Sequence, residues 1–595
     1  MNLPQAATLA RRRNVLAAGI VLLMGGVGLR YFQLQILNHD QYRTHAEKNS
    51  IREVRLPAPR GLMFDRHGKF LVTNRSQYSL AVIPAEVRNS LDELSQLGRY
   101  LDISAETIGR IVAEADGPYR RFQPVTLYSD VGFTQRSHIE EHRLEFPGIF
   151  FVDEAIRHYP SRARATHLIG YLRAISTEDF AQYRREGYYM GDVVGAAGLE
   201  REYERVLRGR DGYRYHLVDN LLRDLGAVPN KPTLRPTAGQ DVHLSLDLDM
   251  QALGERLMEG RRGALIAMEP TSGEIYAYVS APDYVLAPFT GPVPVALWQQ
   301  WRDHPDKLLL NRPVNGLYPP GSVFKLVAAA AALAAGEIDP SATIECNGIY
   351  RFGNRNFHCN IWPGHGEVNL EDALRLSCNI YFYKLIQWIG FEAWEDMATR
   401  FGFGQPTGIE MPQESTGLVP DPSYMDRKYA DVGWTAGHLL NMVLGQGDLL
   451  VSPLQIARMT AAIANGGRLV NPVLVRFPAR PSRRKEYVEL LPSIWRDLRA
   501  AMYQVVNGDQ GTGFRAKVSG GDIFGKTGTA QNPHGAGHSW FTGFVKTISG
   551  NEMVVTILVE QGGLGSRTAA PLAAEMFRFY IDRYSNGAGD LAQVP

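Results

Sequence analysis

The chain has 595 residues, with 63 Lys and Arg, 62 Asp and Glu, and a net charge of +1. This length predicts two or more domains, and the balanced charge argues against binding of nucleic acid through a strong positive field. The 59 glycines and 34 prolines favour a loop-rich α+β protein over a helical bundle.

The N-terminal segment predicts a membrane anchor. Three arginines at 11–13 precede an apolar run over residues 15–29, which resumes after Arg30 and ends near residue 37. This length suits one transmembrane helix at 15–37, and the lack of a clear cleavage site favours an uncleaved anchor over a signal peptide. By the positive-inside rule, residues 1–14 form a cytoplasmic tail and the body is exported.

A mixed region follows at residues 38–238. Asp65 to Gly68 predicts a hairpin turn before a strand at 70–74, and residues 84–150 read as an insertion with helical pieces such as 90–101. Short strands and turns are expected at three further segments, 157–160, 167–171 and 198–203. Their Arg, Asp and Gly residues are interpreted as structural ion pairs and turns.

Residues 225–240 are rich in Pro and Gly and predict a domain boundary. The second domain then covers residues 239–584, and 585–595 are expected to be a disordered tail. Strands are predicted at 242–246, in a hairpin over 263–279, and at 522–525, 538–544 and 552–559, with helices between them. This order predicts one sheet covered by helices.

A helix in the second domain carries a candidate nucleophile. Ser322 and Lys325 stand at i and i+3 before a nearly all-apolar stretch that ends at Gly336, a predicted C-terminal cap. An isolated pair of this kind is usually a helix cap and a solvated lysine. Burial lowers the pKa of a lysine, so Lys325 is a candidate base for the Ser322 proton.

Two later motifs complete a serine acyl-transfer site. Ser377-Cys378-Asn379 supplies a hydroxyl to relay a proton and an amide to hold a carbonyl, and the run Lys526, Thr527, Gly528, Thr529 supplies a cation beside hydroxyls. Lys526 is expected to keep its charge and bind a substrate carboxylate. Ser482–Lys485 and Ser549–Asn551 repeat two of the patterns, but they lie in the wrong order and setting.

The three cysteines of the chain, Cys346, Cys359 and Cys378, lie between these motifs, with His358 and His365 among them. A disulfide between Cys346 and Cys359, free thiols, and a zinc site of three thiolates and one imidazole are all open, because no CxxC pair is present.

The three motifs make the chain resemble the class B penicillin-binding transpeptidases. The likeness extends to Pro59–Gly68 and Arg157–Tyr203 in the non-catalytic domain, and to Tyr318–Ser322, Gly445–Gly447 and Trp540–Gly543 in the catalytic one. It implies a penicillin-binding and serine β-lactamase-like fold on a β-rich pedestal, and a peptidoglycan D,D-transpeptidase with Ser322, Lys325, Ser377, Asn379 and Lys526 as catalytic residues. Thr527, Gly528 and Thr529 would bind substrate. The oxyanion hole would be the N–H groups of Ser322 and Thr529.

Within class B, Trp362 to Gly366 and the KTGT form are most similar to penicillin-binding protein 2 of the elongation machinery. This resemblance implies a bacterial inner-membrane protein with a periplasmic catalytic domain. Its partners would be stem peptides, β-lactams, a SEDS-type glycosyltransferase and elongation proteins. It also favours zinc, held by Cys346, Cys359, His365 and Cys378 beside the active site, with no cofactor needed for the chemistry.

Several alternatives share these motifs. A division transpeptidase of the penicillin-binding protein 3 type, or a scaffold that activates the glycosyltransferase, would have the same organisation. Carboxypeptidase side activity needs only water as the acceptor. A β-lactamase or a β-lactam sensor is disfavoured by the pedestal and the single anchor.

Overall fold

The computed structural model describes residues 3–38, 51–87, 91–115, 124–146, 148–189, 192–218, 224–229, 231–290, 293–478 and 486–584. The chain forms two compact units. Unit 1 contains residues 1–59, 76–155 and 209–238, and unit 2 contains residues 60–75, 156–208 and 239–595. The expected tail at 585–595 and the repeated motif at Ser482 lie outside the described residues.

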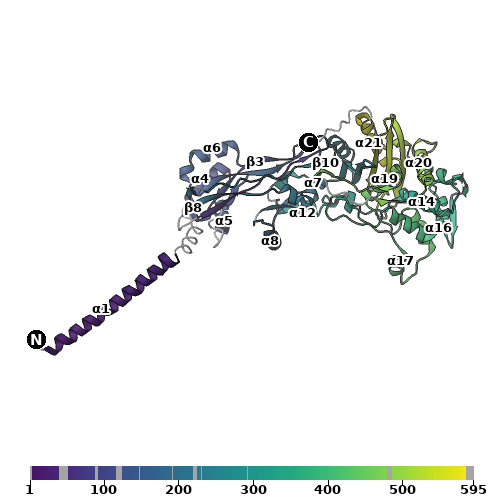
Figure 1. The fold of residues 1–595 in the computed structure, drawn as a ribbon. Coiled ribbons are helices and arrows are strands. Elements are labelled where there is room, and N and C mark those ends of the chain that lie inside the picture. Colours follow the sequence, from purple (N-terminus) through teal and green to yellow (C-terminus); the bar gives the residue numbers. More distant parts are fainter. Residues whose placement is uncertain are drawn as a thin grey trace. The chain divides into compact units, whose positions relative to one another are not determined.

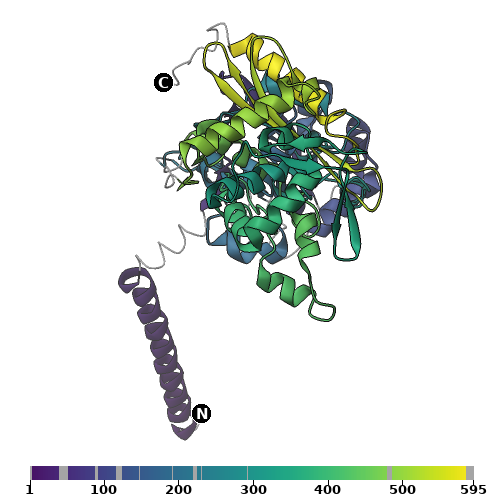
Figure 2. The same cartoon turned by 90° about the vertical axis from the view of Figure 1, so that its right-hand side faces the viewer.

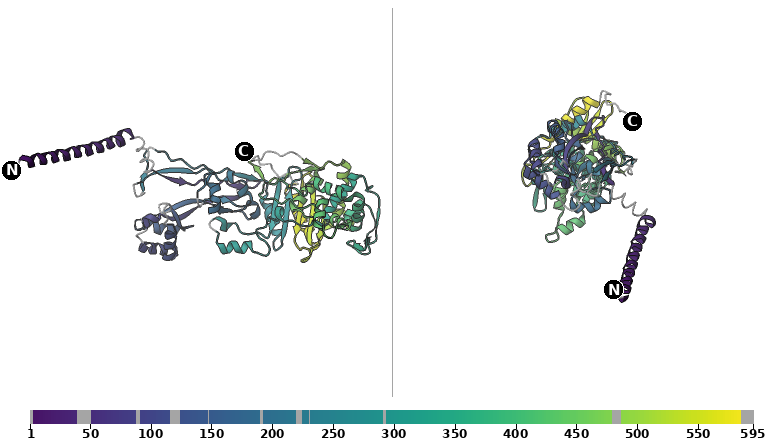
Figure 3. Two further views of the ribbon diagram at one scale, coloured as in Figure 1. Left: turned by 90° about the horizontal axis from the view of Figure 1, so that it is seen from below. Right: turned by 90° about the vertical axis from the view of Figure 1, so that its left-hand side faces the viewer.

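Unit 1 begins with a long helix. α1 (Leu3–Phe32) continues into the π-helix η1 (Gln33–Leu37), and Figures 2 and 3 show α1 as one unbroken helix. Residues Ala10–Leu37 are long and apolar enough to cross a membrane, with a mean hydropathy of 1.8 and 0% of it buried. An exposed apolar helix of this length fits the predicted single transmembrane span.

The rest of unit 1 combines strands with a helical insertion. Its first sheet is antiparallel, in the order β1 (Ile51–Leu56), β8 (Gly212–Val218), β9 (Asp224–Ala227). In the insertion, β4 (Val125–Tyr128) pairs with the later part of β3 (Phe70–Val82), and β5 (Ile149–His158) also pairs with β3. The helices there are α3 (Pro84–Val87), α4 (Leu91–Leu101), α5 (Ala105–Ala115) and α6 (Phe133–Glu141), followed by η2 (Arg143–Glu145). The helix expected at 90–101 is thus confirmed as α4. Buried apolar side chains, among them Leu80, Leu97, Ile108 and Ile139, hold the insertion together.

Unit 2 starts with the predicted hairpin. β2 (Met63–Phe64) and the first part of β3 flank a turn in which the Asp65 N–H donates to Lys69 O at 2.9 Å and Gly68 has φ +77°. A positive φ suits glycine, which has no Cβ to clash. β10 (Val242–Leu244) and β18 (Val475–Phe477) extend the sheet in the order β18-β10-β2-β3.

Two segments that were expected to be strands and turns are helical instead. α7 (Thr166–Ile169) is a short buried helix and α9 (Gly198–Glu202) is a short helix that is buried over residues 198–200, and their ends meet at two glycines. A Cβ on Gly198 would lie 2.5 Å from Gly170 N, so only glycines allow this backbone contact. The strand prediction is wrong here because close packing, rather than alternation, sets the local conformation.

The remaining elements of unit 2 before the nucleophile are α8 (Thr177–Arg184), α10 (Glu204–Leu207), β6 (Leu172–Ala174), β7 (Val193–Gly195), α11 (Leu248–Leu257), η3 (Ala287–Thr290), α12 (Val295–Arg302) and α13 (Arg312–Asn315). Those after it are β13 (Ile344–Cys346), β14 (Ile349–Phe352), β15 (Arg355–His358), β16 (Gly366–Val368), α15 (Leu370–Arg375), α16 (Asn379–Arg400), α17 (Pro422–Lys428), α18 (Ala436–Val443), α19 (Pro453–Asn465), β17 (Arg468–Leu469), β19 (Glu486–Tyr487), α20 (Pro492–Asn507) and η5 (Phe514–Ala516).

Charged side chains that sequence reasoning assigned to ion pairs do form them. Glu200 accepts from Arg60 Nη2 at 2.7 Å and from Arg157 Nε at 2.8 Å, and Arg60 also reaches Glu204. The pairs are buried rather than at the surface, with Glu200 0% exposed. Breaking such a pair leaves an uncompensated buried charge, so the cluster fixes one arrangement of these segments.

The core of unit 2 is an antiparallel sheet in the order β12 (Ile275–Ala281), β11 (Gly263–Met268), β22 (Glu552–Val559), β21 (His538–Thr547), β20 (Gly521–Ala530). Figure 1 shows its strands with helices around them, as the sequence predicts. Alternate side chains face opposite sides. Leu265 belongs to the buried cluster that includes α11 and α21 (Ala569–Tyr584), whereas Ile266 belongs to the cluster that includes α19. Since both faces are covered, the strands read as continuous apolar runs.

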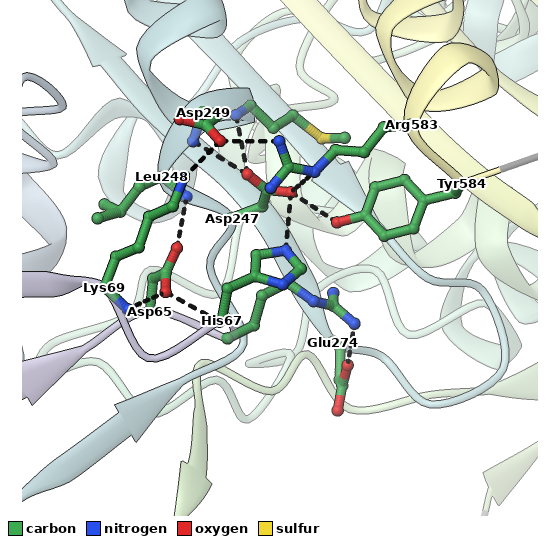
Figure 4. A network of polar contacts seen from close by, with 11 residues as sticks. Asp65, His67, Lys69, Asp247, Leu248, Asp249, Glu274, Arg583 and Tyr584 are labelled. Carbon is green, nitrogen blue, oxygen red and sulfur yellow. Dashed lines mark hydrogen bonds and ion pairs between the residues drawn. The ribbon is translucent and has the colours of Figure 1, made fainter. Parts of the chain in front are cut away.

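A buried carboxylate joins the hairpin, α11 and α21, as Figure 4 shows. Asp247 caps α11 through the N–H groups of Asp249 and Met250, and its other oxygen accepts from Tyr584 at 2.6 Å and from Arg583 at 3.0 Å. His67, from the hairpin turn, has its Nε2 3.3 Å from Asp247 Oδ2. Burial alone would raise the pKa of Asp247, but the hydrogen bonds from His67 and Tyr584 and the charge of Arg583 hold it well below its usual range.

Candidate active site

The nucleophile motif forms a short helical turn that leads into a buried helix. Ser322 is half-buried in η4 (Gly321–Phe324), and Lys325 opens α14 (Lys325–Ala335), which is buried through Ala332. Gly336 caps the helix with φ +70°, as predicted. Because Ser322 and Lys325 are one turn apart, they share a face, and the apolar helix behind them excludes water.

Lys325 reaches into the second motif. Its Nζ donates to Ser377 O and Asn379 Oδ1, both at 2.8 Å, and lies 3.3 Å from Ser377 Oγ. Complete burial lowers the pKa of Lys325 to about 8, although nearby thiols of Cys378 and Cys359 act in the opposite direction. The predicted desolvated lysine is therefore present, and a useful fraction of it is neutral near pH 8.

Ser377 occupies a strained position between α15 and α16. Its φ is +55°, in the left-handed region that side chains other than glycine rarely adopt. Lys526 Nζ lies 3.1 Å from Ser377 Oγ and donates to Thr527 O at 3.0 Å. Strain of this kind persists only where the surroundings fix the residue, and here two lysines do so.

The third motif also contains a buried lysine. Lys526 is fully buried, and burial together with the charge of Lys325 holds its pKa well below the usual range. Two ammonium groups beside one hydroxyl repel each other, so each lysine disfavours the charged form of the other. The expectation that Lys526 keeps its charge stays a prediction, which the burial of Lys526 disfavours in the protein by itself. A carboxylate placed beside it would favour the charged form.

The third motif lies on the edge strand β20, close to the nucleophile turn. Lys526 pairs with Thr542, and Thr529 with Ser539, of β21. A Cβ on Gly528 would lie only 3.0 Å from Pro320 O, and one on Gly321 3.0 Å from Thr529 C. The approach of the two backbones explains the glycines, and it brings the N-terminal end of the turn to the Thr529 backbone.

Other residues at the site lie outside the three motifs, although Gly445 and Gln446 belong to the stretch Gly445–Gly447 that carries part of the resemblance. Thr512 accepts from the Thr527 hydroxyl at 2.8 Å, and Gln446 Nε2 donates to Thr529 O at 3.3 Å. The Gly321 N–H donates to Gly445 O at 2.8 Å. Thr512 had no sequence signal, because it is near the motif only through folding. The Ser549–Asn551 pattern forms the β21–β22 turn, outside the site.

The predicted metal ligands cluster. The Cys346, Cys359, His365 and Cys378 ligand atoms all lie within 4.8 Å of one another. His365 Nδ1 is 3.5 Å from Cys346 Sγ and 3.4 Å from Cys359 Sγ, and the Cys359 and Cys378 sulfurs are 3.8 Å apart. All three cysteines are free, which removes the Cys346–Cys359 disulfide. His358 stays outside the cluster.

The cluster is joined to the catalytic loop. Asn379 donates its N–H to Cys359 Sγ at 3.4 Å and its side-chain amide to His358 O at 3.1 Å, while its Oδ1 accepts from Lys325. Cys378 stands between Ser377 and Asn379. The sulfur cluster therefore positions the residues that contact the lysines.

Family models and relatives match both parts of the chain. The penicillin binding protein transpeptidase domain matches residues 263–578, and the penicillin-binding protein dimerisation domain matches residues 55–244. The chain therefore belongs to the penicillin-binding proteins, and its two domains are those of class B.

Peptidoglycan D,D-transpeptidase MrdA of Acinetobacter baumannii is 30% identical over 98% of this chain and 89% of its own length. Among solved structures, the complex of Helicobacter pylori PBP2 with MreC gives a TM-score of 0.81 at 28% identity, covering 90% of this chain and 100% of the matched chain. A peptidoglycan synthase complex that coordinates polymerization and crosslinking gives 0.72 at 28% identity, covering 98% and 100%. The chain is a peptidoglycan D,D-transpeptidase of the elongation type, as the resemblance implied.

Proposed function

We propose that Ser322 is the nucleophile of this transpeptidase and Lys325 its base. Neutral Lys325 Nζ accepts the Ser322 hydroxyl proton as Ser322 Oγ bonds to the carbonyl carbon of the penultimate D-Ala of a stem peptide. The carbonyl oxygen becomes an oxyanion, which the N–H groups of Ser322 and Thr529 stabilise.

Collapse of this intermediate breaks the peptide C–N bond and leaves an ester on Ser322. The leaving D-Ala amine needs a proton, and Ser377 Oγ relays one from the lysines. The observation that carries this role is that both Lys325 Nζ and Lys526 Nζ lie within 3.3 Å of Ser377 Oγ. An amine of a second stem peptide then attacks the ester, forms the cross-link and returns the proton to Ser322.

Lys526, with Thr527 and Thr529, is proposed to bind the terminal carboxylate of the stem peptide, with Gly528 allowing close backbone approach. The carboxylate favours the protonated form of Lys526, so that substrate and proton bind together. Asn379 positions Lys325, which donates to its Oδ1, and its side chain is proposed to hold a carbonyl of the substrate. A β-lactam would acylate Ser322 by the same route, and water as the acceptor would give carboxypeptidase side activity.

The test is labelling with a fluorescent penicillin. Wild-type protein should become covalently labelled, and Ser322→Ala should not. Ser549→Ala, which changes the serine of the repeated motif in the β21–β22 turn, is the matched control and should label normally. A wild-type protein that binds no penicillin covalently would defeat the proposal.

We further propose that residues 1–14 are cytoplasmic, that 38–238 form the pedestal and that 239–584 form the periplasmic transpeptidase domain. The arginines at 11–13 support this orientation. Partners of the elongation machinery, including a SEDS-type glycosyltransferase, would bind the anchor and pedestal. If a Ser322→Ala protein still supports glycan polymerisation by that partner, its scaffold role is separable from its chemistry.

The sulfur cluster is proposed to hold zinc. With Zn–S bonds of about 2.3 Å, sulfurs on a tetrahedron lie about 3.8 Å apart, and the Cys359–Cys378 separation is 3.8 Å. Three thiolates and His365 Nδ1 are a donor set that zinc prefers for structural sites. Zinc would fix the Ser377 loop and take no part in the reaction. Elemental analysis of protein purified without added metal should find about one zinc per chain.

A further inference from the structure

The segment after β22 contacts both sides of the active site. We call residues 560–565 the strap. Glu560 Oε1 accepts from Tyr318 Oη at 2.7 Å, and Tyr318 belongs to the loop that precedes Ser322. At the other end, the Gly565 N–H donates to Thr529 Oγ1 at 3.3 Å, on the strand that carries the third motif. Six consecutive residues therefore connect the two elements that must enclose the substrate carbonyl.

The strap lies closely on β20 and β21. A Cβ on Gly565 would be 2.4 Å from Gly528 O and 2.3 Å from Trp540 O. The Gln561 N–H donates to His538 Nδ1 at 3.1 Å, at the end of β21. These contacts leave the strap little freedom to move relative to Thr529.

Glu560 is itself held by buried arginine. Arg312, 1% exposed, donates from Nε to Glu560 Oε1 at 2.7 Å. Its Nη2 donates to Asp306 O at 2.7 Å, so the guanidinium has a fixed orientation. A buried ion pair seldom adds much net stability, but a fully hydrogen-bonded one fixes geometry.

Tyr318 transmits this geometry to the nucleophile turn. Its N–H and C=O pair with Val451, each at 3.0 Å, and Trp540 Nε1 donates to Pro319 O at 3.0 Å. Burial, followed by the charge of Glu560, raises the pKa of Tyr318, so the hydroxyl stays protonated and donates. Only three residues separate Tyr318 from Ser322.

We propose that Glu560 is a positioning residue for acylation: through Tyr318 on one side and the strap on the other, it sets the spacing between Ser322 and Thr529. This inference rests on the proposed nucleophile role of Ser322. Glu560 contacts no reacting atom, so its loss should slow the acylation step and leave initial binding nearly unchanged. A misplacement of about 1 Å is enough to cost about 100-fold in rate.

The test measures acylation by a fluorescent penicillin over a range of concentrations, which separates the first-order acylation constant from the noncovalent dissociation constant. Tyr318→Phe should lower the acylation constant about tenfold while the dissociation constant changes less than about twofold. Glu560→Gln should act in the same direction. Because the two residues act through one contact, their effects on the acylation constant should not multiply. The double variant should acylate only slightly more slowly than the slower of the two single variants.

Tyr580→Phe is the matched control. Tyr580 is also buried and makes one hydrogen bond from its hydroxyl, to Glu552 O at 3.1 Å, at the opposite end of β22. The Tyr580→Phe variant should lower the melting temperature about as much as Tyr318→Phe does. Its acylation constant should equal that of the wild type. If Glu560→Gln does not fold, Tyr318→Phe decides alone. A wild-type acylation constant in Tyr318→Phe, or an equal fall in Tyr580→Phe, would overturn the positioning role; failure of the wild type to label would instead overturn the proposed function.

Discussion

Lys325 and Lys526 both reach the Ser377 hydroxyl, with their Nζ atoms 3.3 and 3.1 Å from Ser377 Oγ. One lysine comes from a buried helix and the other from an edge strand, 149 positions from Ser377. Because both are desolvated, their protonation is coupled through this hydroxyl. The number of protons bound at the site is therefore a property of the two lysines together, and its dependence on pH can be measured.

Acylation should depend on pH through the base. Burial lowers the pKa of Lys325 to about 8, so the neutral amine predominates above pH 8 and the ammonium below it. The acylation constant should rise with pH to a plateau above about 8 and be about 100-fold lower at pH 6. Stopped-flow acylation between pH 6 and 9 gives the profile, with circular dichroism to confirm that the fold persists. Lys325→Arg should acylate negligibly at every pH, because its guanidinium stays charged. A flat wild-type profile would rule out Lys325 as the base.

Gly528→Ala should disturb the contact between the third motif and the nucleophile turn. The new methyl group would lie 3.0 Å from Pro320 O and from Val323 Cγ2, and the Val323 side chain is fully buried. We expect acylation to fall about tenfold and the free energy of unfolding to fall by ~1–3 kcal/mol.

Gly109→Ala is the control for this change, since a Cβ there meets nothing within 4 Å and the residue lies in α5. It should stabilise slightly, by roughly 0.5–1 kcal/mol, with unchanged acylation. Unaltered acylation in Gly528→Ala would mean that the turn and β20 can separate freely.

Removing one ligand should empty the proposed zinc site. His365→Ala is expected to lose bound zinc and to melt at a lower temperature, because metal binding stabilises only the folded chain. Elemental analysis and thermal unfolding, each with and without a chelator, measure both effects.

His358→Ala changes a histidine in the same segment that lies outside the cluster, so its zinc content and its response to chelator should match the wild type. Equal zinc content in the two variants would show that His365 is not a ligand.

Asp247→Asn should destabilise unit 2. The buried carboxylate is 0% exposed and accepts from Arg583, Tyr584 and His67, so its loss removes the acceptor that all three donors share, and Arg583 keeps only Asp249. We expect a loss of ~3–5 kcal/mol in the free energy of unfolding, measured with denaturant at pH 7. Asp249→Asn, at a half-exposed carboxylate that pairs with Lys69 and Arg583, should cost at most ~1 kcal/mol.

The same carboxylate predicts an acid limit. Its pKa in the folded chain is held below the ordinary value of 3.8, so its stabilisation is complete above about pH 4. As the pH falls below 4 towards the folded pKa, that stabilisation should be lost progressively in the wild type. Asp247→Asn should lack this part of the acid dependence. If wild type and variant lost stability in parallel below pH 4, the ion pairs of Asp247 would contribute nothing.

Local patterns predicted much of the fold. The hairpin at Asp65–Gly68, the strands of the central sheet and the helix behind Ser322 follow from turn residues and periodicity, which act over a few neighbours. The segments at 166–169 and 198–202 were misassigned, because their conformation depends on two glycine backbones meeting across the fold. Thr512 and Glu560 gave no signal, since their partners are distant in sequence.

The sequence by itself determined the chemistry of this protein: an apolar anchor, a serine and lysine one helical turn apart, and a cysteine inside the second motif. These depend on residue type and short spacing. Only the tertiary structure decided how that chemistry is tuned. It gathered three cysteines and His365 at one place, and it buried Lys526 as deeply as Lys325. It also linked Glu560 to the nucleophile loop. Desolvation and distance between remote segments arise when the chain packs, and no local pattern encodes them.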